Sequence, residues 1–175
     1  KDAQVYSMRG AVYGYLDHFD GSLQDFDQAF RLDTQNSAIY QNRGGIYTKL
    51  GRHREALADL NQALKRDRRF SAAQFSRCLT YLCLGEWDSA ALDAQAALRF
   101  RAWRGVYPLY IIIAGHLAYR GAGSHEDGKK FLADALKKYP IRRWPHPVIR
   151  YLRNEITAPD LLSQAKDTDK LTEAH

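Results

Sequence analysis

Cysteine and proline are scarce in this sequence, and long apolar runs are missing. Its 175 residues include two Cys and five Pro. Two cysteines are too few for the disulfide framework of a small secreted domain. The longest strongly apolar run, residues 106–114, is far shorter than the ~20 residues that a membrane-spanning helix needs. We therefore predict no transmembrane segment and a fold held together by its own packed core.

The charge is that of a globular chain with one basic region. Charged residues make up 26% and hydrophobic residues 45% of the sequence, and the net charge is +6. Residues 1–98 carry 12 Lys and Arg against 12 Asp and Glu, whereas residues 99–153 carry 12 against 3. Such a block is typical of the solvated face of a helical protein, and less often of a contact with nucleic acid or an anionic surface.

The sequence repeats itself with a period of 34 residues. The clearest matches are aromatic, basic and glycine positions, where Tyr6, Arg9, Gly10 and Tyr13 align with Tyr40, Arg43, Gly44 and Tyr47. Apolar and small residues recur at helical spacing within each copy, with a Gly or Asp break midway. Each copy is therefore predicted to form two antiparallel helices. One such pair cannot bury its apolar face alone, so neighbouring pairs are expected to stack.

We divide the chain into four repeat units and a tail. The units are residues 3–36, 37–70, 71–104 and 107–140, and a C-terminal helical segment follows over residues 141–175. The period, the Gly-x-x-Tyr of the first helix and the Ala-x-x-x-(Phe or Leu)-x-x-Ala of the second resemble the tetratricopeptide repeat family. This resemblance implies an all-α fold, a right-handed superhelical array of about four helix pairs. The chain departs from the family pattern at Thr34, Arg68 and Ala102, where Pro is favoured, and at Asp17, where Gly is common.

An Arg and an Asp recur 16 residues apart in the first three units. The pairs are Arg9 with Asp25, Arg43 with Asp59, and Arg77 with Asp93. The spacing places the Arg on the first helix and the Asp on the second helix of one unit, so we predict an ion pair that orients the two helices. In the fourth unit Ile113 replaces the Arg, and the pair ends there.

The C-terminal tail differs from the repeats. Residues 144–175 resemble the region that follows the early repeats in bacterial tetratricopeptide proteins of the NlpI lipoprotein type. The matching residues are Trp144, Pro145, Pro147, Val148, Ile156, Leu161, Leu162 and residues 173–175. This resemblance implies a bacterial envelope scaffold and favours a periplasmic or envelope location over a cytoplasmic one. Because the sequence opens with Lys1 and not with Met, earlier removal of a leader is an open alternative.

No constellation of catalytic or metal-binding residues is found. The six His show no metal-ligand spacing with one another or with the two Cys. Residues 123–130 approach a phosphate-binding loop, but Lys130 stands where a Ser or Thr should hold magnesium and a helix precedes the loop where a strand should. We predict a non-catalytic protein without cofactor or metal.

The first helices of such an array line a concave groove that usually holds an extended peptide or a partner helix. The predicted groove residues are Ser7, Met8, Ala11, Tyr15, Gln41, Asn42, Gly45, Lys49, Phe75, Ser76, Leu79 and Ile112. Family members that bind a C-terminal carboxylate use Lys, Asn and Arg at these positions, and only Asn42 fits, so an apolar peptide or amphipathic helix is the predicted partner. As an alternative, the tail of the chain itself covers part of the groove or the last repeat, through Val148, Ile149, Tyr151 and Leu152.

Two other kinds of partner are compatible with the sequence. The basic residues and aromatics of segment 99–143 interleave as they do in proteins that bind single-stranded nucleic acid. This nucleic-acid or anionic-surface reading is the alternative function, although cations and aromatics at helix C-termini have a structural explanation. Association of the chain with copies of itself, a homo-oligomer, is also compatible with an uncovered end of the array.

Overall fold

The computed structural model of the chain describes residues 2–99 and 107–139, together with Val148 and Leu152. These residues form eight α-helices and no strand. The helices are α1 (Ala3–Tyr15), α2 (Phe19–Leu32), α3 (Ser37–Lys49), α4 (His53–Arg66), α5 (Ser71–Leu84), α6 (Trp87–Arg99), α7 (Tyr107–Gly121) and α8 (His125–Lys138). The predicted all-α fold is confirmed.

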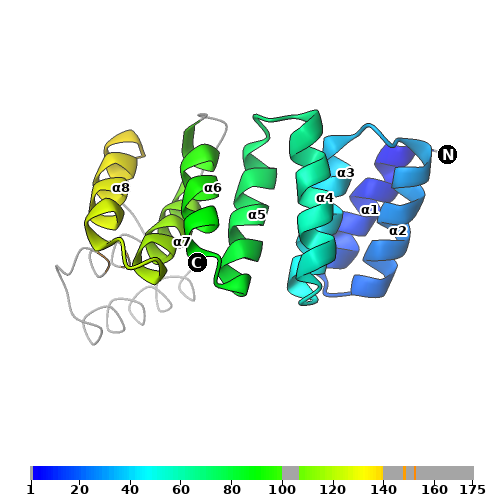
Figure 1. Cartoon of the computed structure of the whole chain (residues 1–175). Helices are drawn as coiled ribbons and strands as arrows, with labels where there is room; N and C mark the ends of the chain where they lie inside the picture. The colour runs from blue at the N-terminus through cyan, green and yellow to red at the C-terminus, as the bar shows by residue number, and fades with distance from the viewer. Residues whose placement is uncertain (1, 100–106, 140–147, 149–151, 153–175) are drawn as a thin grey trace, which may run out of the picture.

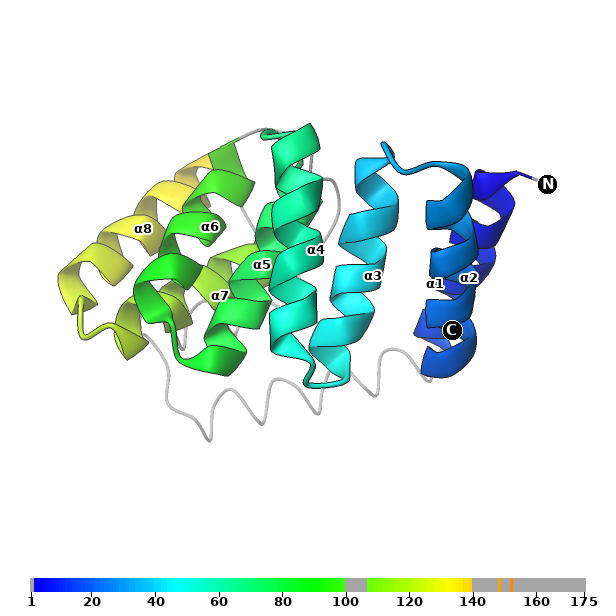
Figure 2. The same cartoon turned by 45° about the vertical axis from the view of Figure 1, so that its right-hand side comes forward.

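The helices form pairs that follow one another across the molecule in chain order, from α1 and α2 at one end to α7 and α8 at the other (Figure 1). Within the pairs α1 packs on α2, α3 on α4, α5 on α6 and α7 on α8. Between pairs, α2 packs on α3, α4 on α5 and α6 on α7. Figure 2 shows the same stack turned about the vertical axis, with the end formed by α1 and α2 brought forward. The arrangement is the right-handed superhelical array of helix pairs that the repeat predicts.

Side-chain caps and left-handed turns set the ends of several helices. Asp2 and Asn36 each accept a hydrogen bond from the backbone N–H two residues on, which satisfies one free donor at the start of α1 and of α3. The turns inside the pairs use a left-handed residue, and at three of them this residue is glycine: Gly51, Gly85 and Gly123, with φ of 71°, 72° and 74°. In the first pair Asp17 takes the same conformation at φ 58°, so the predicted departure from Gly leaves the turn unchanged.

Small residues let the two helices of a pair approach closely. At Gly44 of α3, an added Cβ would lie 2.9 Å from Leu60 Cγ of α4 and 3.3 Å from the Ala56 carbonyl oxygen. No such approach is possible without movement of the neighbours, since carbon atoms pack at ~3.5 to 4.0 Å. This contact explains why the repeat keeps a small residue at that position.

The larger buried core lies among α5, α6, α7 and α8. Its members include Cys78, Ala94, Ile112 and Leu132, and Leu152 from the C-terminal tail packs against it. A smaller cluster joins α3, α4 and α5 through Tyr40, Ala63, Leu64 and Ala73. Apart from Val148 and Leu152, the tail over residues 141–175 lies outside the described residues.

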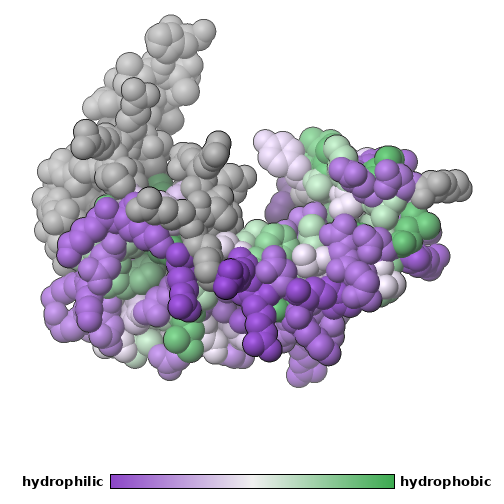
Figure 3. Space-filling model, turned by 90° about the horizontal axis from the view of Figure 1, so that it is seen from above, coloured by the Kyte–Doolittle hydropathy of each residue, from purple (hydrophilic) through white to green (hydrophobic). Residues whose placement is uncertain are grey.

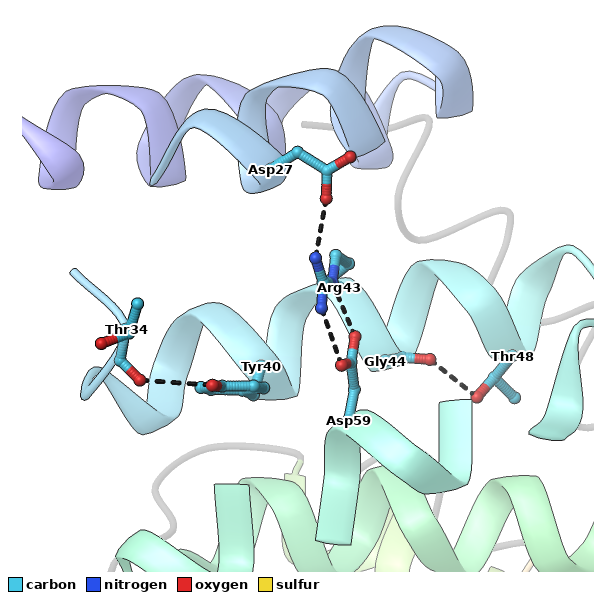
Figure 4. A network of polar contacts seen from close by, with 7 residues as sticks. All are labelled: Asp27, Thr34, Tyr40, Arg43, Gly44, Thr48 and Asp59. Carbon is cyan, nitrogen blue, oxygen red and sulfur yellow. Dashed lines mark hydrogen bonds and ion pairs between the residues drawn. The ribbon is translucent and has the colours of Figure 1, made fainter. Parts of the chain in front are cut away.

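The three predicted Arg–Asp pairs are confirmed. Arg9, Arg43 and Arg77 each donate from Nε and Nη2 to the two carboxylate oxygens of the Asp 16 residues later. Figure 4 shows the central pair, in which Arg43 of α3 reaches Asp59 of α4. The same guanidinium donates from Nη1 to Asp27 of the preceding pair over 2.7 Å. The Arg therefore orients two helices within a pair and also joins that pair to its predecessor.

Candidate functional site

A pocket of about 330 Å³ opens on the side of the first helices. Residues from α1, α3 and α5 line it, and α2 contributes one residue at its base. The lining residues are Ala11, Gly14, Tyr15, Phe26, Gln41, Asn42, Gly45, Ile46, Thr48, Lys49, Ser76 and Leu79. Viewed along the helices, the surface is hollowed on one side, and white and green side chains, neutral to hydrophobic, gather on the floor of the hollow (Figure 3).

Hydrogen bonds between neighbouring first helices hold the pocket wall in place. Gln41 Nε2 donates to Ser76 Oγ over 3.0 Å, and the hydroxyls of Thr48 and Thr80 lie 2.8 Å apart. These contacts join α3 to α5 across the joint between two pairs. The wall is thus fixed before any ligand arrives, which reduces the entropy cost of binding.

Lys49 brings a positive charge to the pocket, but that charge is partly neutralised. Its Nζ donates to the Gly14 carbonyl over 3.0 Å and lies 3.4 Å from Asp17 Oδ1. The ammonium thus binds the C-terminal end of α1, where carbonyl groups lack helical partners. A ligand carboxylate would have to compete with both groups.

Asn42 offers the pocket a side-chain amide without a partner among the described residues, and Gly45 leaves open space beside it. The Asn42 side chain is half-buried, and it makes no hydrogen bond within the described part of the chain. Its amide carries both a donor and an acceptor. An added Cβ at Gly45 would meet no atom within 4 Å, so the floor of the pocket is open beside this glycine.

Most of the predicted groove residues meet in this pocket. Eight line it: Ala11, Tyr15, Gln41, Asn42, Gly45, Lys49, Ser76 and Leu79. Ser7, Met8, Phe75 and Ile112 do not. The Met8 side chain is 62% exposed and lies outside the pocket, and Phe75 is half-buried against the larger core.

The assignment of Ile112 to the groove surface is wrong. Its side chain is fully buried in the core of α5 to α8, against which Leu152 of the tail also packs. Sequence reasoning missed Gly14, Phe26 and Ile46, which line the base of the pocket. All three are small or apolar at repeat positions that also serve the core, and nothing in their spacing distinguishes the two roles.

Comparison with known proteins identifies the fold. A family model described as tetratricopeptide repeat matches residues 37–70, which span α3 and α4. No curated protein sequence matches the chain. The structure of the MamA protein superposes with a TM-score of 0.68 at 19% identity, over 82% of this chain and 79% of that one. This chain has the tetratricopeptide repeat fold.

Two further solved structures share this tetratricopeptide repeat fold. A tetratricopeptide repeat protein from Parabacteroides merdae gives a TM-score of 0.68 at 17% identity, over 96% of this chain and 64% of that one. This chain therefore spans less than two thirds of that protein. The first TPR of Spaghetti (RPAP3), bound to the HSP90 peptide SRMEEVD, gives a TM-score of 0.56 at 18% identity, over 75% of this chain and 94% of that one.

A larger pocket, of about 910 Å³, lies on the other face of the repeat array, where α6 and α8 run past the turn between α4 and α5. Leu92 and Phe131 provide apolar surface there, and Arg99, Lys130 and Lys138 provide positive charge. Lys138 is already engaged, because its Nζ donates to the carbonyls of Leu98 and Arg99 at the end of α6. This contact matches the favourable position of a cation at a helix C-terminus.

The basic segment 99–143 is only partly described, and residues 100–106 and 140–143 lie outside the described residues. Within it, Lys129 pairs with Glu126 over 2.7 Å, and Lys137 lies 3.5 Å from Asp134. Both ion pairs are exposed and join neighbouring turns of α8. They neutralise part of the positive charge on which the nucleic-acid alternative depends.

No three His, Cys, Asp or Glu residues within the described ranges lie close enough to hold a metal ion. In the same ranges, no helix has the length and apolar character needed to cross a membrane. The loop that approaches a phosphate-binding motif forms the turn before α8 and its first turns, where Gly128 is buried and Lys130 is exposed.

Proposed function

We propose that the chain is a non-catalytic protein interaction scaffold, and that its concave pocket binds a peptide or a helix of a partner protein. The observation that carries the proposal is that first helices of three successive pairs converge on one pocket with a fixed wall. Concave surfaces of stacked helix pairs are suited to extended or helical segments. The RPAP3 repeat domain in complex with an HSP90 peptide supports a peptide as the kind of ligand.

The chemistry of the pocket favours a ligand segment with an apolar side chain over one that ends in a carboxylate. Tyr15 and Leu79 face the pocket and are 85% and 38% exposed, so covering them would remove apolar area from water. Asn42 can accept from and donate to one peptide group of the ligand. The only Lys of the lining is bound to the end of α1, which weakens its attraction for a carboxylate.

An envelope role is the finer part of the proposal. It rests on the resemblance of residues 144–175 to bacterial NlpI-type proteins, and those residues lie outside the described part of the chain except for Val148 and Leu152. Leu152 packs against the core of α5 to α8. This contact favours the reading in which the tail covers the last repeat.

The test starts from short random peptides displayed on phage and selected on the immobilised chain. The affinity of each selected peptide is then measured by fluorescence anisotropy with variants Tyr15→Glu and Leu79→Glu. The control is Leu92→Glu, which places the same charge on an exposed leucine of α6 that does not line the concave pocket. We expect at least a tenfold loss for both pocket variants and no change for the control. Peptides that bind all four proteins equally would rule out the pocket.

A further inference from the structure

The joint between α6 and α8 lacks the charged bridge of the earlier joints. There, an Arg of the first helix joins two successive second helices, as Arg43 does between Asp27 of α2 and Asp59 of α4. Arg77 joins α4 to α6 in the same way. In the fourth pair Ile113 replaces this Arg. Within the described residues, no guanidinium joins α6 to α8.

The pocket of about 910 Å³ opens at this joint, and we call it the α6–α8 pocket. Two of its lining residues stand where the earlier joints have partners of the Arg. Phe131 of α8 has the position of the paired Asp, and Gln95 of α6 has that of Asn61 in α4. Gln95 donates to the Tyr119 hydroxyl instead. The volume lies in the range of roughly 300 to 1,000 Å³ that is typical of ligand pockets.

The helical walls of the α6–α8 pocket are apolar. Leu98, Phe131 and Ala135 are buried there, whereas Leu92 is 66% exposed. Contact of a ligand with Leu92 would therefore remove apolar area from water. The pocket shares no lining residue with the concave pocket, so the two can be tested separately.

The rim of the α6–α8 pocket carries free positive charge. Five Lys and Arg line the pocket, against two Asp. Lys138 is bound to the end of α6. Arg68, Arg99 and Lys130 are exposed, and their side chains have no acceptor in the part of the chain that the structure describes. They come from the turn before α5, the end of α6 and the first half of α8, so three elements present a cation to one apolar pocket.

We propose that the α6–α8 pocket is a second binding site, and that it binds an acidic peptide segment of a partner protein. A large apolar side chain of that segment packs on Leu92 and the wall of α8. Asp or Glu residues beside it pair with Arg68, Arg99 and Lys130. The attraction of these charges is complementary to the apolar contact, because the cations surround a surface that has no charged partner of its own for them.

A peptide fits this pocket better than a strand of nucleic acid. Proteins that bind single strands stack the bases on aromatic rings, but Phe131 is 9% exposed and packs on Tyr119, with the ring centres 5.5 Å apart. Asp127 and Asp134 of α8 also line the pocket. They repel a strand that carries a phosphate at every nucleotide, whereas a peptide can present neutral residues or backbone N–H groups to them.

The probes are fluorescein-labelled octapeptides with one Phe, Trp or Leu among Asp and Glu, and the same peptides with Asn and Gln in place of the acids. An oligothymidylate of about 12 nucleotides tests the nucleic-acid alternative. Affinities for the whole chain are measured by fluorescence anisotropy, and amide shifts in NMR spectra locate the site. The variants are Arg68→Glu, Lys130→Glu and Leu92→Ala. The matched control is Lys129→Glu, an exposed neighbour on α8 that does not line the pocket.

We expect the acidic peptides to bind with the largest shifts in α6 and α8, and their amide counterparts to bind at least tenfold more weakly. Arg68→Glu and Lys130→Glu should each lower the affinity at least tenfold, Leu92→Ala about threefold, and Lys129→Glu less than about twofold. No binding of any acidic peptide, or equal losses for Lys130→Glu and Lys129→Glu, would overturn the proposal. So would tighter binding of the oligothymidylate, or largest shifts at Asn42 and Gly45, which would place the peptide in the concave pocket.

Discussion

Arg43 holds Asp59 with two parallel hydrogen bonds, 2.7 Å from Nε to Oδ2 and 2.9 Å from Nη2 to Oδ1. Asp59 is 7% exposed, so its charge is stabilised almost entirely by this partner. The bond raises the pKa of Arg43 above its ordinary value, the hydrogen bond to Asp59 being the largest cause. The pair recurs in the first and third helix pairs, which makes its contribution measurable by comparison within one molecule.

Replacement of Arg43 by Ala is expected to lower the free energy of unfolding by about 3 to 5 kcal/mol, the range seen when one partner of a buried pair is removed. Arg9→Ala should cost clearly less, because the Arg9 side chain is 55% exposed and water can reach the carboxylate left behind. Urea unfolding of the two variants gives both values. Equal losses below ~1 kcal/mol, as for surface pairs, would contradict a buried structural role.

The left-handed turns predict two opposite changes in stability. Gly51→Ala places a Cβ at φ 71° and should destabilise the chain by about 1 to 2 kcal/mol. Asp17→Gly relieves a side chain at φ 58° and should stabilise it, by less, because Asp tolerates this region better than most residues. Thermal unfolding measured by circular dichroism checks both signs. A destabilised Asp17→Gly would show that the contact of Asp17 with Lys49 outweighs the backbone strain.

The two thiols should differ in reactivity. Cys78 is fully buried, and burial raises its pKa to about 12, whereas Cys83 is exposed. Since the thiolate is the reactive form, a thiol reagent at pH 8 should modify Cys83 in the native protein and both cysteines only after denaturation. The variant Cys83→Ser should then show no fast-reacting thiol. Equal native reaction at both positions would show that the α5 to α6 interface opens readily.

Acid should destabilise the fourth helix pair through His116. The side chain is 4% exposed, and its Nδ1 lies 3.3 Å from the Gly128 carbonyl oxygen. Burial is the largest cause that lowers the pKa of His116 below its ordinary value. The unfolded chain therefore binds a proton first as pH falls below about 6.5, and the stability present above that pH is lost as the folded-state pKa is crossed.

Unfolding measured at several pH values between about 7.5 and 5 should show this loss in the natural chain. His116→Gln should reduce the slope, and His18→Gln, at an exposed position in the first helix pair, should leave it unchanged. A slope that persists in His116→Gln would assign the pH dependence to other groups.

The fold could be predicted from the sequence because the repeat fixes which positions are small, apolar and charged. Gly44, Arg43 and Asp59 form the contacts that their 34-residue recurrence indicates. The division of the chain into units of that length stays a prediction about boundaries. The tail was predictable only by resemblance, and apart from Val148 and Leu152 it lies outside the described residues.

The pocket was harder to predict than the fold. Repeat position predicts Asn42, Gly45 and Leu79 on one face, and all three line the pocket. The size of the pocket depends on how side chains of neighbouring helix pairs pack, and the repeat does not encode this packing. Ile112 holds a position equivalent to that of Asn42 but is fully buried in the core of α5 to α8.

The most direct test of the proposed function is to map a selected peptide onto the chain by NMR. The amide shifts should be largest at pocket residues of the first helices, Ala11, Asn42, Gly45 and Leu79, and they should vanish in Leu79→Glu. Largest shifts on the second helices α2, α4 or α6, persisting in Leu79→Glu, would contradict a peptide-binding role for the concave pocket.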